Sequence, residues 1–343
     1  MADFEYLKEW LRLSDNDKLT CFQAITDMYD LKMPAVEKDW WVTHTLAIIF
    51  SMPYSKSLIF KGGTSLSKAW KIIERFSEDI DLALDREFLG FAGDLSKTQI
   101  SKLRYTSYEF LTEKFTPELQ LKFNELGFID VLVKPREVIN HDQDPLVIEI
   151  YYPKLTEKDI YLRPGVLVEI GSRSLKEPFS PCKFKTLVAE NYSNKLFVDN
   201  EITIPTVNVE RTFLEKVFLL HEEYQRPTEK RRVERLSRHL YDIEKISQTL
   251  YFQKALSDKD LYRTIVVHRE KFSHLSGIDY TKHEPQFINI IPPENLLSLW
   301  EKDYAEMSES MIYGEKLSFS KLIDNIKQVN DKINKKAYLV STI

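Results

Sequence analysis

The stretch FKGGTSLSKAWKIIERFSEDIDLAL, residues 60–84, contains the side chains best suited to metal chemistry. Asp79 and Asp81 stand two residues apart in a segment that alternates like a β-strand, so both carboxylates point to one face. Two such charges about 4 Å apart repel by on the order of 1 kcal/mol in water, and by more when partly buried. A divalent cation removes that repulsion, and all-oxygen ligands suit Mg²⁺. The pair therefore predicts a Mg²⁺ site, with Mn²⁺ as an alternative ion.

The segment KGGTS just before it contains groups that could bind phosphate. Backbone N–H groups of Gly62 and Gly63 and of the following helix start can face phosphate oxygens, and the hydroxyls of Thr64 and Ser65 can donate hydrogen bonds. Taken singly, a glycine pair before Ser or Thr is often only a turn with a helix cap, and an acidic strand face is often only solvated. Together, one helix apart, the two motifs predict a nucleoside triphosphate beside the metal ion.

Composition and charge restrict the class of protein. The 343 residues are 43% hydrophobic and 29% charged, which favours a globular fold with a substantial core over disorder or a fibrous repeat. The net charge of -5, from 48 Lys and Arg against 53 Asp and Glu, argues against a uniformly basic nucleic-acid coat but allows a local basic patch. No Walker-type Gly-Lys-Ser motif or glycine elbow occurs, which argues against P-loop and acyl-hydrolase chemistry.

Cysteine usage and apolar runs predict the compartment. Cys21 and Cys182 are the two cysteines and have no metal-type spacing, as expected for a reduced, cytoplasmic protein. The first ten residues have no apolar signal core, and the run HTLAIIFSM is too short to span a bilayer. We therefore expect a cytoplasmic protein without a membrane partner.

The elements that must position these residues follow from hydrophobic periodicity. We expect one helix capped by Ser14 or Asp15 and a second between Pro34 and Pro53. Later helices are expected at residues 65–76 and about 97–126, and strands at residues 57–60, 79–84, 128–133, 146–152, 165–172 and 201–207. From Val209 onward the pattern is almost wholly helical. This order predicts an α+β fold, with N-terminal helices and a strand-containing core in residues 1–208 and a helical C-terminal domain in residues 209–343.

The quoted stretch also resembles the signature of the AbiEii/AbiGii nucleotidyltransferase toxins, which are members of the DNA polymerase β-like nucleotidyltransferase superfamily. Three further segments resemble that family in the same order: EKDWWVTHTL at residues 37–46, RTFLEKVFLLH at residues 211–221 and SRHLYDI at residues 237–243. The resemblance implies a polymerase-β-like core with a mixed sheet, and an active site to which the C-terminal domain contributes.

The resemblance also assigns residues outside the quoted stretch. Lys216 lies at the edge of an apolar stripe on its helix. Spacing alone therefore favours a snorkelling lysine, whose stem packs on the stripe while its ammonium reaches solvent. The family pattern implies instead an active-site lysine that neutralises triphosphate charge. Asp242 matches the last catalytic aspartate of the family, as a base or as a polar anchor. Arg238, which lies in the same motif as Asp242, is a candidate nucleotide contact. Lys61 of the glycine segment is another.

An arginine-rich segment precedes Asp242. Arg231, Arg235, Arg238 and Asp242 fall at i, i+4, i+7 and i+11, which predicts one stripe on a helix. The stripe is either a solvated basic face with a local ion pair, or an electropositive wall near the nucleotide or along an RNA backbone.

A third carboxylate, on a strand beside the first two, is expected from the superfamily. Glu169 in GVLVEIGS is the leading candidate, because its apolar neighbours Val168 and Ile170 face the other way. Glu149 and Asp130 have the same local pattern, and the sequence does not separate the three.

These features together predict a Mg²⁺-dependent nucleotidyltransferase. By resemblance, it would transfer a nucleoside monophosphate from an NTP to RNA, for example the 3′ end of a tRNA. It would act as a growth-arresting toxin of a toxin–antitoxin or phage-defence (abortive infection) system, with its antitoxin encoded nearby. One alternative is a metal-dependent RNA phosphoesterase or nuclease that uses the same carboxylates. Another is a non-catalytic NTP- or RNA-binding module, against which the intact set of Asp79, Asp81, Lys216 and Asp242 argues.

Overall fold

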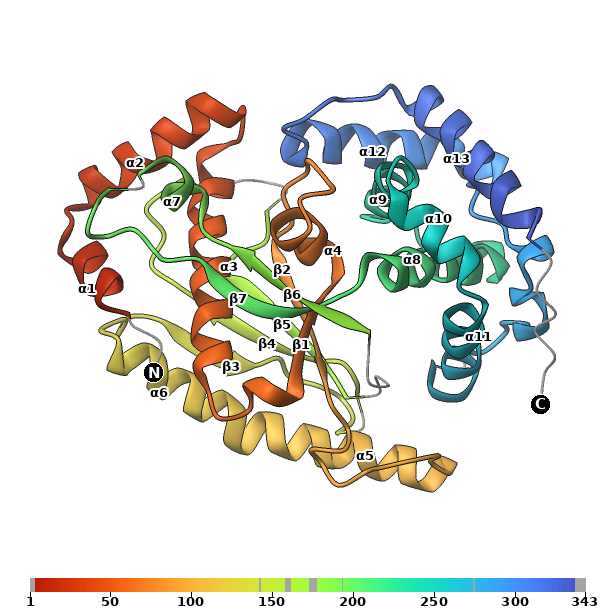
Figure 1. Ribbon diagram of the computed structural model, residues 1–343, viewed down its shortest axis with the longest axis horizontal. Coiled ribbons are helices and arrows are strands. Elements are labelled where there is room, and N and C mark those ends of the chain that lie inside the picture. Colours follow the sequence, from red (N-terminus) through yellow and green to blue (C-terminus); the bar gives the residue numbers. More distant parts are fainter. Residues whose placement is uncertain are drawn as a thin grey trace. The chain divides into compact units, whose positions relative to one another are not determined.

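The chain divides into two compact units. The computed structural model describes residues 4–141, 143–157, 162–172, 178–192, 194–273 and 275–336. The first unit comprises Met1–Lys71 and Phe76–Val207, and the second comprises Ile72–Arg75 and Asn208–Ile343. The short segment of the second unit therefore lies, in sequence, inside the first. Each unit is described by itself (Figure 1).

The first unit contains a sheet and the N-terminal helices. Its helices are α1 (Glu5–Arg12), α2 (Asp15–Tyr29), α3 (Met33–Ser51), α4 (Gly62–Thr64), α5 (Lys97–Glu109), α6 (Thr116–Glu125) and α7 (Leu187–Asn191). Its strands are β1 (Leu58–Lys61), β2 (Asp79–Leu84), β3 (Leu132–Pro135), β4 (Leu146–Tyr151), β5 (Val166–Gly171), β6 (Phe179–Phe184) and β7 (Ile202–Val207).

All seven strands form one mixed sheet in the order β3-β4-β5-β2-β1-β7-β6. The pairs β2–β5 and β1–β7 are parallel and the remaining pairs are antiparallel. This confirms the expected α+β fold with a mixed sheet. Strand β6 was not predicted, because it contains Pro181 and because its exposed residues, Phe179, Pro181 and Lys183, are not uniformly polar as in a typical half-buried strand. An edge strand tolerates a proline, whose missing N–H is not needed there.

The two faces of the sheet differ in character. Ile80 and Leu82 of β2 are fully buried, as are Val168 and Ile170 of β5, and the helix α3 packs against these two strands. The two predicted metal ligands, Asp79 and Asp81, have the opposite parity in β2. The alternation of the strand therefore directs its apolar side chains to the core and its carboxylates to the other face.

Helix α3 is buried on all sides rather than on one stripe. Trp40, 2% exposed, is at the centre of its contacts: the ring stacks on Trp10 at 5.0 Å between centroids and meets Trp41 edge-on at 5.0 Å. The preceding helix α2 starts as predicted, with the Ser14 hydroxyl accepting a hydrogen bond from the N–H of Asp17 at 3.2 Å. The N-terminal helices thus form part of the core of the first unit.

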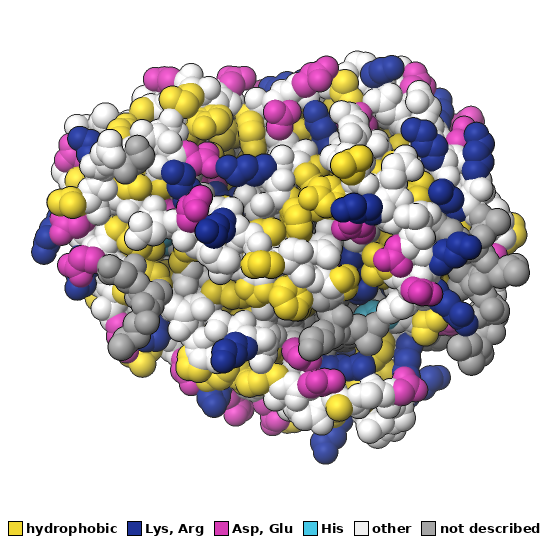
Figure 2. Space-filling view, in the orientation of Figure 1, with side chains coloured by type: hydrophobic (Ala, Val, Ile, Leu, Met, Phe, Trp, Pro, Cys, Tyr) yellow, Lys and Arg dark blue, Asp and Glu magenta, His cyan; other side chains and the backbone are white. Residues whose placement is uncertain are grey.

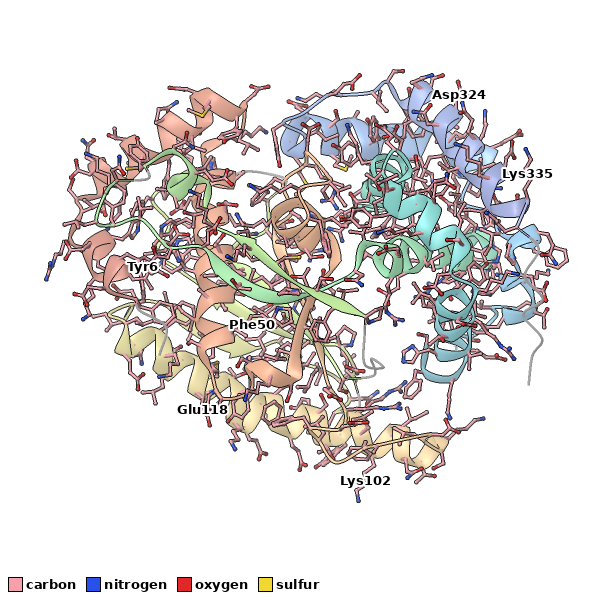
Figure 3. All side chains as sticks on the ribbon, viewed as in Figure 1. Tyr6, Phe50, Lys102, Glu118, Asp324 and Lys335 are labelled. Carbon is pink, nitrogen blue, oxygen red and sulfur yellow. The ribbon has the colours of Figure 1, made fainter. Side chains whose placement is uncertain are left out.

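The long helix expected at residues 97–126 is present. It runs as α5, a π-helical turn at Phe110–Phe115 and α6, and begins with a capping box between Ser96 and Gln99. The hydroxyl of Tyr54, in the segment before β1, donates to the carboxylate of Glu118 of α6 (Figure 3), whose two oxygens lie 2.8 and 2.9 Å from it. This contact fixes the helix to the segment that leads into the glycine turn.

The helix expected at residues 65–76 is shorter than predicted. After a π-helical turn it ends at Ala69, and Lys71 has φ +52°, a left-handed conformation that a helix cannot continue through. Residues 72–75 instead join the second unit, where Arg75 forms a β-bridge with Ile312 and the N–H of Tyr313 donates to the carbonyl of Glu74 at 3.0 Å. Tertiary contacts override the helical pattern here.

The second unit is helical, as expected for the C-terminal part. Its helices are α8 (Val209–Gln225), α9 (Ser237–Ser247), α10 (Leu250–Ser257), α11 (Lys259–His268), α12 (Leu297–Met311) and α13 (Phe319–Asn334). Helix α8 packs against α9, α10 and α11, and α9 packs against α12 and α13. Helices α8 and α9 are thus central in this unit.

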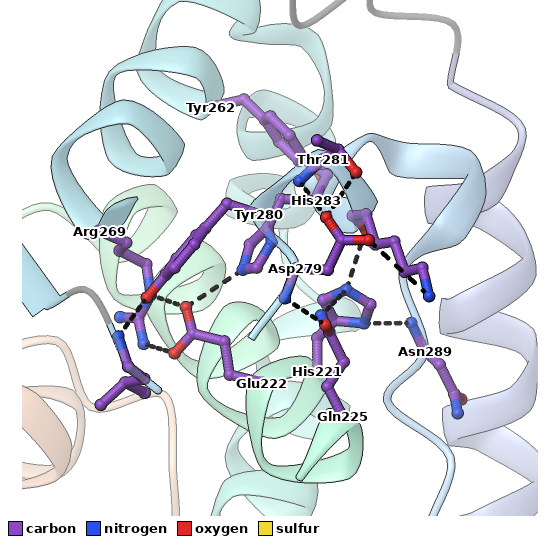
Figure 4. A network of polar contacts seen from close by, with 12 residues as sticks. His221, Glu222, Gln225, Tyr262, Arg269, Asp279, Tyr280, Thr281, His283 and Asn289 are labelled. Atoms are coloured by element: carbon purple, nitrogen blue, oxygen red, sulfur yellow. Dashed lines mark hydrogen bonds and ion pairs between the residues drawn. The ribbon is translucent and has the colours of Figure 1, made fainter. Parts of the chain in front are cut away.

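A buried polar network anchors α8 to the segments that follow α11 (Figure 4). Glu222 pairs with the guanidinium of Arg269, with Nε–Oε1 at 2.7 Å, and with Nε2 of His283 at 3.1 Å. Burial works to raise the pKa of Glu222, but the hydrogen bonds from Arg269 and His283 outweigh it and lower the pKa to about 2. The pairing keeps this carboxylate ionised inside the unit.

The surface carries charges of both signs. Acidic and basic side chains are interspersed over the face drawn in Figure 2, in keeping with the small net charge. Within the described ranges, none of the helices combines the length and apolarity needed to cross a bilayer.

A buried histidine in α3 predicts an acid-sensitive fold. Burial lowers the pKa of His44 to about 4, so between pH 6.5 and 4 the unfolded chain binds a proton at this site that the folded chain does not. Stability should therefore fall as pH drops through that window, by up to roughly 1.4 kcal/mol per pH unit from this group. We expect His44→Phe to remove that slope in urea unfolding measured from pH 7 to pH 4. The exposed His141 is the control, and a slope that His44→Phe leaves unchanged would contradict the assignment.

Candidate active site

The glycine turn and the acidic strand touch each other in the first unit. Gly62 follows β1 with φ +80°, a conformation that L side chains rarely adopt. A Cβ atom at Gly62 would lie 1.9 Å from Oδ2 and 2.7 Å from Cγ of Asp81. Because only a hydrogen fits there, the glycine allows the Asp81 carboxylate to lie against the backbone of the turn. The structure thus brings together the two motifs from which the sequence predicts a nucleotide and metal site.

Strand register adds two charged side chains on the same face. Lys61 of β1 lies opposite Asp81 in the antiparallel pair, and Glu169 of β5 lies beside Asp81 in the parallel pair. Side chains opposite each other in paired strands point to one face, with Cβ atoms about 4.5–5.5 Å apart. Asp79 shares this face because it stands two residues before Asp81. Three neighbouring strands therefore present one lysine and three carboxylates together.

The register also ranks the candidates for the third carboxylate. Glu149 lies one strand farther out, on β4, where it accepts hydrogen bonds from Arg136 Nε at 2.8 Å and the Tyr151 hydroxyl at 2.7 Å. Asp130 lies in an exposed turn before β3 rather than in the predicted strand. Glu169 is the candidate that stands next to the acidic pair, and the geometry favours it.

The hydroxyls of the glycine segment have other partners than predicted. Thr64 and Ser65 are fully buried; the Thr64 hydroxyl donates to the carbonyl of Asp79 and the Ser65 hydroxyl to the carbonyl of Gly62 at 2.8 Å. A hydroxyl has one proton, so neither can also donate to a phosphate in this arrangement. In this arrangement their role is structural, with Thr64 fixing the turn to the start of β2, and a role as phosphate donors stays a prediction.

The acidic face fits a Mg²⁺ ion that shares its ligands with a nucleotide. Asp79 and Asp81 are partly exposed, so ligand can reach them. Among the residues that the structure describes, no three His, Cys, Asp or Glu side chains gather closely enough to hold a metal ion by themselves. Mg²⁺ is commonly bound through one or two carboxylates, with substrate phosphates and water completing its sphere. Two strand carboxylates with Glu169 as their neighbour suit that mode.

The second unit contains a buried cluster around Asp242. Asp242 of α9 is fully buried, and Lys216 of α8 places Nζ 2.9 Å from its Oδ2. Nε and Nη2 of Arg75 donate to Oδ1 and Oδ2 of Asp242, both at 2.7 Å. Lys216 is therefore paired with a buried acid and does not snorkel to solvent.

Arg75 is the member of this cluster that sequence reasoning missed. It is 1% exposed, and a charged group at that depth must be paired. Within a segment expected to be a helix, an arginine is most simply interpreted as solvated. No local pattern distinguishes it; the signal is the long-range pairing with Asp242.

The surroundings of the cluster are electropositive. Nδ1 of His239 lies 3.4 Å from Nζ of Lys216. Burial holds the pKa of His239 well below its usual range. The positive charges of Lys216, Arg238 and Arg75 lower this pKa further, and the carboxylate of Asp242 acts in the opposite direction. Three cations around one carboxylate leave an excess of positive charge, which favours an anionic ligand.

Between the two roles left open for Asp242, the structure favours the anchor. Burial works to raise its pKa, but Arg75 and Lys216 outweigh that effect and hold the pKa well below the usual range. A carboxylate with so low a pKa and both oxygens occupied accepts a proton poorly. Asp242 thus orients Lys216.

The predicted arginine stripe is wrong. Helix α9 begins at Ser237, and Arg235 has φ +61°, so the backbone is not helical there. Arg231 lies in the connection after α8, where its Nε donates to a backbone carbonyl at 2.8 Å. Of the four residues, Arg238 and Asp242 share a helix, one turn apart on α9.

The contact between the turn and the strand predicts an unusual cost for one glycine substitution. Gly62→Ala should destabilise the protein by about 2 kcal/mol more than Gly90→Ala, because overpacking adds about 1–3 kcal/mol to the backbone strain. Gly90 is the matched control, with φ +86° and open space for at least 4 Å around the position that a Cβ would take. Urea unfolding of both variants measures the difference. Equal losses would show that the Asp81 side chain can move away from the turn.

The cluster around Asp242 predicts unequal effects of two neutralising changes. Asp242→Asn leaves Arg75 and Lys216 buried without their carboxylate, and should cost about 3–5 kcal/mol. Lys216→Met leaves Asp242 with both hydrogen bonds from Arg75 and should cost less than about 1.5 kcal/mol. Chemical denaturation measures both. A Lys216→Met variant as unstable as Asp242→Asn would contradict the arrangement.

Comparison with known proteins gives both family and fold. A model of the family described as "Nucleotidyl transferase AbiEii toxin, Type IV TA system" matches residues 46–325. The structure of MenT4, a nucleotidyltransferase toxin from Mycobacterium tuberculosis, is similar at a TM-score of 0.56 and 15% identity, over 90% of this chain and 86% of that chain. JHP933 from Helicobacter pylori aligns over 89% of this chain and 95% of that chain at 12% identity. Its TM-score of 0.36 is too low to indicate a shared fold. No curated protein sequence matches the chain.

These findings agree with the motifs. The family match extends from within α3 through the acidic strand to α13, and the likeness to MenT4 supports the fold expected from the resemblance. The chain belongs to the AbiEii family of nucleotidyltransferase toxins of type IV toxin–antitoxin systems.

Proposed function

We propose that this nucleotidyltransferase uses Mg²⁺ to transfer a nucleoside monophosphate from an NTP to RNA, with the 3′ end of a tRNA as the acceptor. The observation that carries the proposal is the Asp81 carboxylate lying against the side-chain-free backbone of Gly62. Because the acidic side chain and the turn lie in contact, one nucleotide could bind the turn through its phosphates and share a metal ion with Asp81.

The first unit would bind the metal and the triphosphate. Asp79 and Asp81, with Glu169 beside them in register, would hold the cation. The backbone of Gly62 and Gly63 would face the phosphates. A divalent cation bound there neutralises phosphate charge and orients the α-phosphorus for attack.

The glycine turn contributes through its backbone, and Lys61 through its charge. Thr64 and Ser65 belong to this nucleotide-binding segment by holding its shape rather than by donating to phosphate. Lys61, opposite Asp81 on the same face, would contact the nucleotide once the metal occupies the carboxylates.

The second unit would supply Lys216 to offset charge on the triphosphate, with Asp242 as its anchor and Arg238 as a further nucleotide contact. The excess positive charge around His239 supports this role.

The reaction would be an in-line displacement. The acceptor hydroxyl oxygen forms a bond to the α-phosphorus, the bond to the oxygen bridging to the β-phosphorus breaks, and pyrophosphate leaves. The hydroxyl proton would pass to solvent water, because both carboxylate oxygens of Asp242 are already engaged by Arg75 and Lys216. The contribution of the protein is mainly positioning and charge stabilisation.

The biological setting follows from the family. Type IV toxin–antitoxin membership implies a separate antitoxin, and we propose that it is encoded beside this chain and opposes growth arrest, in phage defence among other settings. Two buried free thiols, Cys21 and Cys182, support a cytoplasmic location.

Transfer of label from each α-³²P-labelled NTP to total RNA with Mg²⁺ tests the proposal. We expect wild-type protein to lengthen and label a small RNA class, and Asp81→Asn and Lys216→Met to lose about 10²–10³-fold in rate. Glu169→Gln should also be impaired. Glu149→Gln, whose carboxylate is already engaged by Arg136 and Tyr151, is the matched control and should stay near wild type.

The same assay separates the two alternatives. RNA that becomes shorter in a carboxylate-dependent way would support a nuclease. Nucleotide binding by folded protein without transfer of any NTP would support a non-catalytic module, and either result would overturn the proposal.

A further inference from the structure

Helix α3 contains three consecutive charged residues in a helix that is buried on every side. Glu37, Lys38 and Asp39 are 2%, 1% and 4% exposed. A buried charge is strongly unfavourable unless it is paired and hydrogen-bonded. Consecutive residues of an α-helix point about 100° apart, so three in a row reach three different neighbours.

Lys38 contacts the segments that lead into both strands with predicted metal ligands. Its Nζ lies 2.7 Å from Oε2 of Glu78, the residue before Asp79, and 2.9 Å from the carbonyl oxygen of Arg163. The same Oε2 of Glu78 accepts a hydrogen bond from the N–H of Arg163 at 2.9 Å. Arg163 lies three residues before β5, on which Glu169 stands. One ammonium and one carboxylate thus join the start of β2 to the approach to β5.

Asp39 reaches the helical turn that follows the glycines. Its Oδ1 pairs with the ammonium of Lys68, which lies in the turn Ser65–Ala69. Its Oδ2 accepts a hydrogen bond from the N–H of Leu187, at the start of α7, at 2.9 Å. Asp39 therefore fixes the turn to the start of α7.

Glu37 completes the set without touching either motif. Its carboxylate accepts hydrogen bonds from the N–H groups of Leu155 and Thr156, at 2.8 and 3.1 Å. It fixes the loop after β4, so its role is confined to the fold.

We infer that Lys38 and Asp39 are positioning residues that set the spacing between the metal-binding strands and the glycine turn. The inference rests on the proposed function. Lys38 is linked to the acidic strand through Glu78, and Asp39 is linked to the turn through Lys68. Buried ion pairs are weak contributors to stability, because apolar groups of similar volume often replace them without loss, and what such a pair can add is a defined geometry.

The two ion pairs hold different elements, so the loss of each pair should change a different measured quantity. Lys38 with Glu78 controls the strands, so its loss should raise the Mg²⁺ concentration needed for nucleotide binding. Asp39 with Lys68 controls the turn, so its loss should weaken nucleotide binding even at saturating Mg²⁺. A purely structural role would change the fraction of folded protein and neither of these quantities.

The test uses full-length protein and calorimetric binding of α,β-methylene-ATP and the other three α,β-methylene NTPs at varied Mg²⁺. In Lys38→Met/Glu78→Gln we expect the Mg²⁺ midpoint to rise at least tenfold, with an unfolding midpoint in urea close to wild type. In Asp39→Asn/Lys68→Met we expect at least a tenfold loss of analogue affinity at saturating Mg²⁺. The exposed pair Lys122→Met/Glu125→Gln on α6 is the control and should change neither.

The outcomes are distinct. If wild type binds the analogue and both folded double variants bind it with unchanged Mg²⁺ midpoint and affinity, the positioning role is overturned and the proposed function stands. If wild type itself shows no Mg²⁺-dependent binding of any analogue, the proposed function fails and this inference fails with it. Should one double variant not fold, the other carries the test, because each pair predicts its own measurable change.

Discussion

The close approach of the Asp81 carboxylate to Gly62 is the constraint on which the rest of the site depends. It requires a residue without a side chain at a positive φ, and a strand register that places Asp81 opposite Lys61. The same register places Glu169 beside Asp81. A shift of one residue would turn all of these side chains to the apolar face. The packing of Ile80 and Leu82 in the core therefore holds the acidic face in place.

Charge is segregated within the chain in a way that suits nucleotidyl transfer. The face of the first unit that surrounds Asp81 is rich in carboxylates, which favours a cation as ligand. The cluster around Lys216 in the second unit has more positive than negative charge, and its carboxylate, Asp242, is fully buried. Family membership supplies the nucleotide as the substrate, and the electrostatics explain why the metal would come with it.

Local patterns predicted the α+β class, most of the helices and strands, and the meeting of the glycine turn with Asp81. They did so because alternation, capping residues and glycine positions are local properties. Arg75 and the end of the helix at Ala69 depend on contacts with residues more than a hundred positions away, which no local period encodes. The partner of Thr64, the carbonyl of Asp79, was missed because a hydrogen bond between a turn and the next strand leaves no periodic pattern in the sequence. Conversely, charged residues inside the apolar run of α3 were visible in the sequence and could have been interpreted as buried pairs.

The most direct measurement is anomalous diffraction from a crystal of the protein grown with Mn²⁺ and a non-hydrolysable NTP. We predict a manganese peak within coordination distance of carboxylate oxygens of Asp79 and Asp81, with phosphate oxygens completing the coordination and the nucleotide against the backbone of Gly62. A manganese ion and a nucleotide bound elsewhere, with these carboxylates directed away from both, would contradict the proposed site.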